Sequence, residues 1–499
     1  MGSVFPEDFD RWLEAARAAF SLPGVSIAVV GDGETHTRVA GVKHLVSGGA
    51  VTADTRFAIG SNTKAMTAVA LGLLVDQGRL AWDDRVQKHL PDFTMYDARA
   101  NERITVRDLL VHRSGLGLGA GDLLVFPETD FSRAEIVQAI GKLKPATQFG
   151  GAYAYDNLLY IVAGAVVEAA SGLTWEAFVR ERMFAPLGMT AWPSGAGLPT
   201  ETLAWPHAKI SAVLRGAGLS TPIERIHDIC AAAPAGGVYA SANDMGRWLG
   251  VALSGGAIPG ANRRLYSEAI ARDLWTPAID IPIDPAIDGF EAVQPQTQAY
   301  ALGVQVQTMQ GEHVISHGGA IFGGVSHTLL LPERGFGLAV MANTEGSLAV
   351  RVIAYRLLAH RLGWPDNDWI GAATTYVASQ VAKATARLEA QERAGTFASP
   401  AAASDYQGVY TDDWYGAATV AADEGGLRLS LDRSPGLSGP LRPIGPDLFE
   451  TAWIDPLSEN AVVTFEREQG RVRRMIMKAA SPFADFSFDF QDLDFERLT

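Results

Sequence analysis

The spacing of apolar residues predicts β-strands near both ends of residues 1–365 and helices between them. The runs at 24–30 and 325–331 are short, rich in β-branched residues and bounded by glycine or proline, as strands are. Residues 158–170 form a longer apolar run that is typical of a buried helix. By the same criteria, helices are expected at residues 61–74 and 105–112, and strands at 301–309 and 337–341. A segment that begins and ends in strands indicates one sheet closed by both ends, with a helical subdomain inserted at roughly 80–255.

Residues 405–499 follow a second pattern, in which short strand-like runs alternate with Gly, Asp and Pro. These runs are 406–410, 417–421, 427–431, 461–467 and 473–478. They predict a small antiparallel barrel that folds around its own core. Residues 366–404 are expected to connect the two parts, with a helix from about 372 and a linker of small residues at 395–404.

Length and charge narrow the classes of protein. A chain of 499 residues exceeds what one hydrophobic core serves, and the net charge of −15 argues against nucleic acid or an anionic membrane as the main partner. A single cysteine, Cys230, excludes an internal disulfide. No apolar run is long enough for a membrane span, and residues 1–8 lack the features of a secretory signal. We therefore expect a cytoplasmic protein, or a periplasmic one if a leader has been removed.

Ser61 and Lys64 are the first candidates for chemistry. Gly60 and Ser61 precede an almost uninterrupted apolar run to Leu74, which is how a buried helix begins. Residues three apart share a helix face, so the hydroxyl and the amine would lie side by side. A lysine desolvated against such a helix has a lowered pKa and can take the proton of a serine. The alternative is a helix-capping serine beside a solvated lysine.

A second candidate element, Tyr155-Asp156-Asn157, precedes the helix predicted at 158–170. It can present a phenol and a carboxamide from one loop to one site. Tyr153 is a competing phenol whose spacing fits less well, and Asn157 could instead cap the helix.

The third element is His317-Gly318-Gly319-Ala320, at the end of a strand-like run. Glycines there allow a substrate backbone to lie against the strand edge, and an N–H group beyond them can help to bind an oxyanion. The alternative for His317 is a hydrogen-bonded structural residue. Other histidines, among them His112 and His327, lack ligand spacing and are expected to be structural or surface residues.

Other known motifs are missing from the sequence. It contains no Gly-x-Ser-x-Gly pentad, no phosphate-binding loop and no His-Glu-x-x-His. Gly115-x-Gly117-x-Gly119 lacks the strand-to-helix context of a dinucleotide site and is predicted to be a flexible loop.

The three elements, in this order and at this separation, resemble the class C serine β-lactamases, the D-alanyl-D-alanine carboxypeptidases and their esterase and peptidase relatives. The resemblance covers about residues 10–362 and includes the runs 109–116 and 234–245. It implies an α/β fold in which an antiparallel sheet is flanked by helices and joined by a helical subdomain. Residues 405–499 look like the lipocalin-like barrel attached to many of these hydrolases.

By this resemblance, Ser61 would be the acylated nucleophile and Lys64 its proton partner. Tyr155 would act as a general acid or base, and Asn157 would bind the amide of the substrate. Whether Lys64 or Tyr155 takes the proton of Ser61 stays open. The oxyanion hole would use the N–H groups of Ser61 and Ala320.

The third element departs from the pattern of many β-lactamases. His317 stands where they have lysine, as in carboxypeptidase and peptidase members, and Gly318 replaces a threonine that grips a substrate carboxylate. With Gly319, these residues would line the substrate. The departures favour peptidases over efficient penicillin hydrolases.

The resemblance implies ping-pong acyl transfer to water, without a metal or an organic cofactor. We expect a peptidase or amidase acting on small peptides, including peptides with D-residues. One alternative is a carboxylesterase on short acyl esters with weak or no β-lactamase activity. Another is a β-lactam-binding or peptide-binding protein that acylates without turnover. A small molecule or short peptide is the expected partner, and the oligomeric state is open, with a homo-oligomer among the alternatives.

Overall fold

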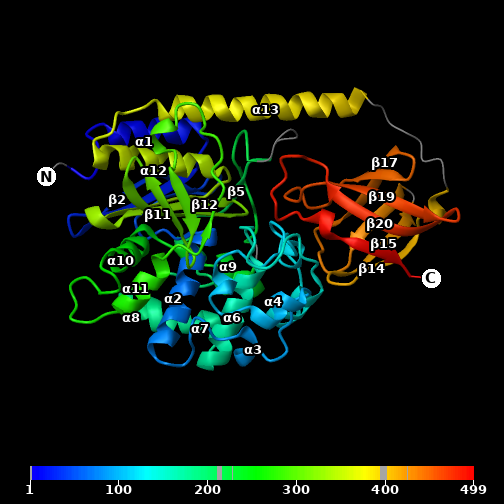
Figure 1. Ribbon diagram of the computed structural model, residues 1–499. Helices are drawn as coiled ribbons and strands as arrows, with labels where there is room; N and C mark the ends of the chain where they lie inside the picture. The colour runs from blue at the N-terminus through cyan, green and yellow to red at the C-terminus, as the bar shows by residue number, and fades with distance from the viewer. Residues whose placement is uncertain (1–2, 211–215, 227–228, 394–401, 424, 499) are drawn as a thin grey trace.

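A nine-stranded antiparallel sheet forms the centre of the first part of the chain in the computed structural model (Figure 1). The structure describes residues 3–210, 216–226, 229–393, 402–423 and 425–498. The strand order is β3-β2-β1-β13-β12-β11-β10-β9-β8. β1 (Gly24–Gly31) pairs with both β2 (Glu34–His44) and β13 (Phe336–Ala342), so the first and last strands of this part are neighbours. This arrangement confirms a sheet closed by both ends.

The remaining strands of the sheet are β3 (Gly48–Ala50), β8 (Ile279–Asp280), β9 (Thr297–Tyr300), β10 (Gln305–Met309), β11 (Glu312–Ile321) and β12 (Gly324–Leu331). Two small ribbons pair β4 (Phe57–Ala58) with β7 (Tyr239–Ala240), and β5 (His207–Ala208) with β6 (Thr221–Pro222). The single strand expected at 301–309 is wrong. A turn at Gly303, with φ of +82°, separates β9 from β10, and a Cβ there would lie 2.8 Å from the carbonyl oxygen of Lys64.

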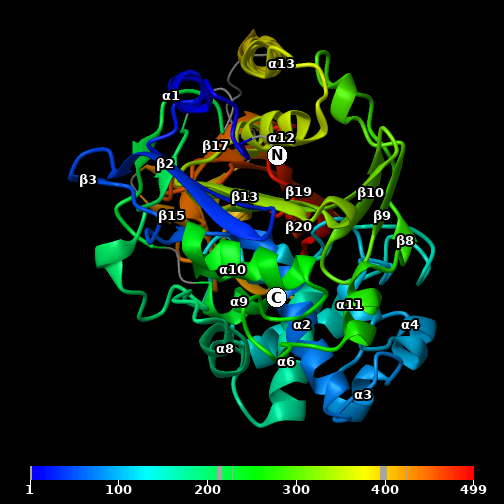
Figure 2. The same cartoon turned by 90° about the vertical axis from the view of Figure 1, so that its left-hand side faces the viewer.

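Helices cover both faces of the sheet. α1 (Phe9–Ala19), α12 (Ser347–Leu362) and α13 (Trp369–Arg393) lie together above it in Figure 1, and α12 contacts β12 and β13. α10 (Ala242–Leu253) packs against β1 and β13 from the other face, as Figure 2 shows. Because both faces are covered, β1, β12 and β13 are buried along their whole length, which explains their continuous apolar runs.

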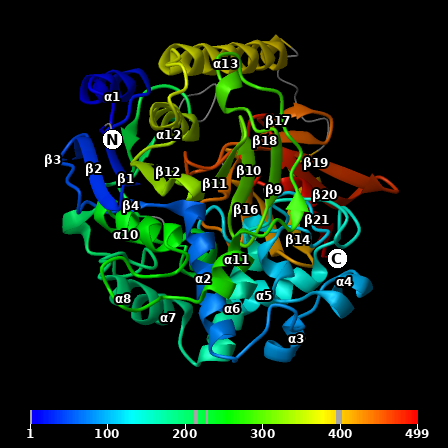
Figure 3. The ribbon, with the colours of Figure 1, turned by 60° about the vertical axis from the view of Figure 1, so that its left-hand side comes forward.

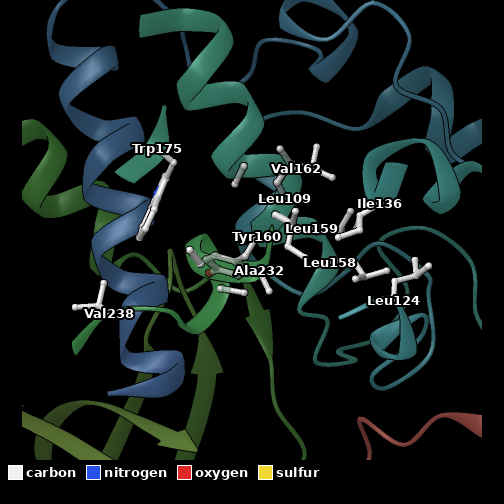
Figure 4. Packing of buried hydrophobic residues seen from close by; sticks show 14 of the residues in the cluster. Leu109, Leu124, Ile136, Leu158, Leu159, Tyr160, Val162, Trp175, Ala232 and Val238 are labelled. Atoms are coloured by element: carbon white, nitrogen blue, oxygen red, sulfur yellow. The ribbon is translucent and has the colours of Figure 1, made fainter. Parts of the chain in front are cut away.

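α2 (Thr63–Asp76) and α6 (Leu158–Ser171) are the central helices of the helical region below the sheet (Figure 3). Both are apolar around most of their circumference, and such helices are buried. Figure 4 shows Tyr160 and Val162 of α6 packed among other apolar side chains of this core, with Trp175 beside α2. The other helices are α3 (Val86–His89), α4 (Ala98–Arg103), α5 (Arg133–Ala139), α7 (Trp175–Val179), α8 (Ala185–Leu187), α9 (Ala233–Gly236) and α11 (Glu268–Trp275).

The helix expected at 105–112 is wrong. The structure has only a short 3-10 helix at Asp108–Leu110. The Asp108 carboxylate accepts hydrogen bonds from the backbone N–H and the hydroxyl of Thr105 and from Arg113. An aspartate that binds its own local backbone in this way competes with regular helix formation.

The C-terminal part is a closed barrel of eight antiparallel strands, which confirms the predicted class (Figure 1). They are β14 (Gly408–Asp412), β15 (Gly416–Asp423), β16 (Gly426–Leu431), β17 (Ser438–Gly445), β18 (Leu448–Thr451), β19 (Ala461–Glu468), β20 (Arg471–Ala479) and β21 (Asp494–Arg497). β21 pairs with β14 and closes the barrel around buried aromatic residues, among them Tyr410 and Phe465. Sequence periodicity missed β17, which contains two prolines, and the short strands β18 and β21.

The predicted linker at 395–404 lies mostly outside the described residues, and the predicted domain boundaries stay predictions. Within the described ranges, no single helix is long and apolar enough to cross a membrane. The bent pair Leu158–Ser171 and Trp175–Leu187, with 74° between its halves, passes that test by length and composition alone. In the same ranges, no group of three or more His, Cys, Asp or Glu side chains could hold a metal ion.

Candidate active site

Ser61 lies in a 3-10 turn, Gly60–Asn62, that leads directly into α2. The turn packs tightly against β11. Gly60 has φ of +52°, and a Cβ on it would lie 2.6 Å from the backbone nitrogen of Ala320. The structure thus places the start of the α2 segment beside the end of β11, although the regular helix begins two residues after Ser61.

Lys64 is fully buried on the first turn of α2, and its Nζ lies 3.1 Å from the Oγ of Ser61. Nζ also donates to Oδ1 of Asn157 over 2.7 Å and to the carbonyl oxygen of Ala235 over 2.9 Å. Burial lowers the pKa of Lys64 to about 7, against the opposing influence of the Asp122 and Asp156 carboxylates. The alternative of a solvated lysine is wrong.

Tyr155 faces the same pair of residues. Its ring lies 4.8 Å from Nζ of Lys64, and Tyr155 and Ser61 line the same cavity. Burial raises the pKa of Tyr155 far above its usual value, against the smaller, opposing influence of the neighbouring Ser61 side chain. Tyr153, the competing phenol, lines the same cavity but lies against the rings of His112 and Tyr300.

Asn157 precedes α6, yet within the described part of the chain its side chain makes no capping bond to that helix. Its two ends have different partners. Oδ1 accepts from Lys64, and Nδ2 donates to Oδ2 of Asp122 over 2.8 Å. The helix-capping alternative is therefore wrong, and the carboxamide lies between a buried amine and a buried carboxylate.

Residues 317–320 form the end of β11 that faces the site. β11 pairs with β12 along this stretch, whereas its pairing with β10 reaches only as far as Ser316, which lies opposite Gln305. Among the described strands, residues 317–321 therefore pair with β12 alone. The edge of β11 that faces away from β12 borders the cavity. Gly318 and Ala320 are exposed there, and Gly319 is packed against Ile59.

His317 is buried, and its Nε2 lies 2.8 Å from the hydroxyl of Tyr300. Burial lowers the pKa of His317 to about 4, and the charge of Lys64 acts in the same direction. At neutral pH the imidazole is therefore uncharged, unlike the lysine found in this position in many β-lactamases.

A cavity of about 610 Å³ opens over Ser61. Its walls include Tyr155, Asn157 and residues 317–320, together with residues 483 and 485–488 of the C-terminal barrel. The charged residues of its described lining are the acidic Asp122, Glu345, Glu459 and Asp485, and no Lys or Arg belongs to that part of the lining.

Sequence reasoning missed three residues of this site. Asp122 is fully buried and holds Asn157, and Tyr300 holds His317. His112, expected to be a structural or surface residue, has its ring centroid 4.3 Å from that of Tyr155, and its Nδ1 accepts from the N–H of Asp156. For Asp122, the glycine-rich run that precedes it was the one feature of the sequence that could have indicated a site, because glycines permit close packing.

A serine and a lysine on one helical turn, a tyrosine beside them in the same cavity, and a strand edge over that cavity define the protein as a serine hydrolase. The chain belongs to the beta-lactamase family, which matches residues 9–363. Residues 392–497 match a second family, described as "Domain of unknown function (DUF3471)".

Relatives support this membership. Penicillin-binding protein 4 of Amycolatopsis lactamdurans is 32% identical over 272 residues, which is 53% of this chain and 69% of that protein. Unguisins hydrolase ungD' of Aspergillus campestris is 28% identical over 390 residues, covering 74% of this chain and 68% of that one.

Solved structures share the fold over almost the whole chain. The octameric penicillin-binding protein homologue from Pyrococcus abyssi superposes with a TM-score of 0.60 at 18% identity, covering 98% of this chain and 99% of that chain. SurE superposes with a TM-score of 0.54 at 22% identity, covering 98% of both chains.

Proposed function

We propose that the protein is a peptidase or amidase that works through an acyl-enzyme on Ser61, with Lys64 as the general base. The observation that carries this proposal is the buried Nζ of Lys64, 3.1 Å from Oγ of Ser61, with a pKa of about 7. A neutral amine at this distance can accept the hydroxyl proton as Oγ attacks a carbonyl carbon.

Tyr155 is proposed to carry the proton onward. Because burial keeps its pKa high, the phenol stays protonated and can donate to the leaving nitrogen while taking the proton held by Lys64. The carbon–nitrogen bond breaks, and the amine departs. Water then attacks the ester on Ser61 and gives a proton to the same pair of residues. That proton returns to Oγ of Ser61 as the acyl carbon–oxygen bond breaks, and the acid is released.

The N–H groups of Ser61 and Ala320 are proposed to bind the oxyanion. The close packing of Gly60 on Ala320 supports this assignment, because it brings the backbone of both residues to one side of the cavity. Asn157 would contact the amide of the substrate while it holds Lys64.

The proposed substrate class rests on the unpaired edge of β11 and on the acidic cavity. An extended peptide can add to that edge as a further strand, with residues 317–320 as its partner. The described lining offers no cation to bind a terminal carboxylate, and His317 is neutral. We therefore propose small peptides, including those with D-residues, whose scissile bond is not next to a free carboxylate.

A carboxylesterase on short acyl esters is the second candidate. The observation that favours it is the apolar wall of the cavity, which includes Phe126, Phe322, Phe486 and Phe488. Esters have a better leaving group than amides, so they need less help from Tyr155.

The deciding experiment compares kcat/KM for a short nitrophenyl ester, an L-peptide amide and a D-peptide amide, each peptide with and without a free C-terminal carboxylate. Ser61→Ala is the control. The proposal expects cleavage of the amidated peptides and weaker cleavage of the free acids. Ester turnover without amide cleavage would contradict the peptidase proposal and support the carboxylesterase. A stable adduct without turnover would indicate a binding protein.

A further inference from the structure

The glycine-rich run 115–121, unexplained by the proposed chemistry, is the surface on which a segment of the C-terminal barrel lies. Gly119 and Gly121 have φ of +68° and +76°. A Cβ on Gly119 would lie 2.7 Å from the carbonyl oxygen of Phe486, so only glycine admits the segment at this position. We call residues 485–489, between β20 and β21, the docking segment.

Buried hydrogen bonds attach the docking segment to the run. The carboxylate of Asp489 accepts from the backbone N–H of Gly121 over 2.6 Å and from that of Leu123 over 3.1 Å. Asp489 is fully buried, so this carboxylate would be costly to bury without those donors. The contact fixes the backbone on both sides of Asp122.

The side chain of Asp122 is held by the same segment. The hydroxyl of Ser487 donates to its Oδ2 over 2.7 Å, and Nδ2 of Asn157 donates to the same oxygen over 2.8 Å. The other oxygen, Oδ1, is buried and has no hydrogen bond to any described residue. Ser487 and Asn157 are thus the side chains that donate to Oδ2 of this carboxylate.

Asp122 determines which end of Asn157 faces the catalytic lysine. A carboxylate accepts hydrogen bonds and does not donate them, so it requires the NH₂ end of the carboxamide. The oxygen end is then directed at Lys64, whose Nζ lies 2.7 Å away. A reversed carboxamide would place two donors against each other and release the amine from its position beside Ser61.

We propose that Ser487 and Asp489 of the barrel are positioning residues of the active site, which act through Asp122 and Asn157 to hold Lys64 against Ser61. This inference rests on the proposed role of Lys64. It makes the C-terminal barrel part of the catalytic apparatus. The chemistry in the first part of the chain then depends on a segment that lies more than 360 residues further along.

The ionisable groups around Asp122 give this role a distinctive signature. Burial raises the pKa of Asp122 to about 7, and the hydrogen bonds from Ser487 and Asn157 oppose that rise. Asp156, Asp489 and Lys64 are the charged groups that face it. Without Ser487, Asp122 becomes neutral more readily and no longer raises the pKa of Lys64. The amine then loses its proton at lower pH.

The test is the rate at which a fluorophosphonate labels Ser61 in the full chain, measured by intact mass across the pH range in which Lys64 titrates. In this reaction Oγ bonds to phosphorus, fluoride leaves, and Lys64 takes the proton of the hydroxyl. We expect Ser487→Ala to slow labelling roughly tenfold on the high-pH plateau. We also expect the midpoint to move about one pH unit lower.

Matched variants separate positioning from general damage. Ser487→Thr keeps the hydroxyl and should restore both rate and midpoint. Ser430→Ala also removes one serine hydrogen bond of the barrel, to Ser438, and should change neither. Asp489→Asn should slow labelling as Ser487→Ala does. If Asp489→Asn lowers the melting temperature, the result for Ser487→Ala alone decides the test.

The outcomes distinguish this inference from the proposed function. Wild-type rate and midpoint in both Ser487→Ala and Asp489→Asn would overturn the positioning role while leaving the role of Ser61 intact. Labelling that persists in Ser61→Ala would instead overturn the proposed function.

Discussion

Lys64 and Asn157 are 93 residues apart in the chain, yet Nζ of the lysine donates to Oδ1 of the asparagine over 2.7 Å. They meet because α2 and α6 are both largely apolar and pack against each other in the helical region. With Asn157 on one side and Ser61 on the other, the amine has little freedom. The position of Lys64 is therefore a result of helix packing as well as of the Ser-x-x-Lys spacing.

Replacement of Lys64 by methionine should lower kcat/KM by about 10³-fold or more, because Ser61 loses its proton acceptor. Steady-state kinetics with whichever of the three test substrates the wild-type protein cleaves would measure the loss. Lys209→Met is a matched control, since Lys209 is also buried but donates to the carbonyl oxygen of Phe20. A similar loss in both variants would show that the removal of any buried lysine lowers activity, and that the effect is not specific to the role of Lys64.

The pH dependence of kcat/KM should show an acid limb near pH 7. Burial lowers the pKa of Lys64 to about 7, and only its neutral form accepts a proton, so activity rises with pH through that value. Asp122 ionises over the same range, so the limb belongs to a coupled pair. Because the pKa of Tyr155 is raised far above 10, its phenol should add no limb around neutrality. A profile that falls from pH 6 to pH 8 would contradict this assignment.

Tyr155→Phe should reduce kcat by about 10²-fold or more with little change in KM, because it removes the hydroxyl that is proposed to donate a proton to the leaving nitrogen. The loss should be larger for an amide than for a nitrophenyl ester, whose leaving group needs no proton. Tyr153→Phe alters a phenol in the same cavity and should cost far less. If Tyr153→Phe has the larger effect, the two tyrosines have been assigned in the wrong order.

Gly319→Ala should destabilise the protein by about 1–3 kcal/mol and also lower its activity. A Cβ at this position would lie 1.9 Å from the carbonyl oxygen of Ile59 and 2.5 Å from Oγ of Ser326, so β11 and the turn containing Ser61 must move apart. For stability, Gly318→Ala is the control, because the nearest atom to its Cβ, Nδ1 of His327, is 4.0 Å away. Equal melting temperatures for the two variants would contradict this packing.

Local sequence patterns, together with the resemblance to a known family, were sufficient for the fold class and for naming the residues that lie around Ser61. The apolar run after Ser61 leads to a buried helix, and the glycine pair after His317 marks a strand edge. Asp122 could not be predicted in the same way. Its significance depends on Ser487, which lies 365 residues away, and no local pattern indicates which carboxylate two packed parts of a chain will enclose.

Side-chain contacts and strand pairing account for the elements in which the structure differs from the local sequence pattern. Residues 105–112 have a helical apolar pattern, but the Asp108 side chain binds the backbone that a helix would use. β17 contains Pro440 and Pro443, and prolines argue against a strand in the sequence. In the closed barrel, pairing with β16 on one side and β18 on the other stabilises this strand. In each case a side-chain contact or a tertiary pairing outweighs the local preference.

The central claim, that Ser61 becomes acylated, is tested most directly by trapping the acyl-enzyme with a slowly released substrate. The intact mass should increase by one acyl group, and peptide mapping should place that group on Ser61. Ser61→Ala should show neither the adduct nor turnover. An adduct on another residue, or full turnover by Ser61→Ala, would contradict the mechanism.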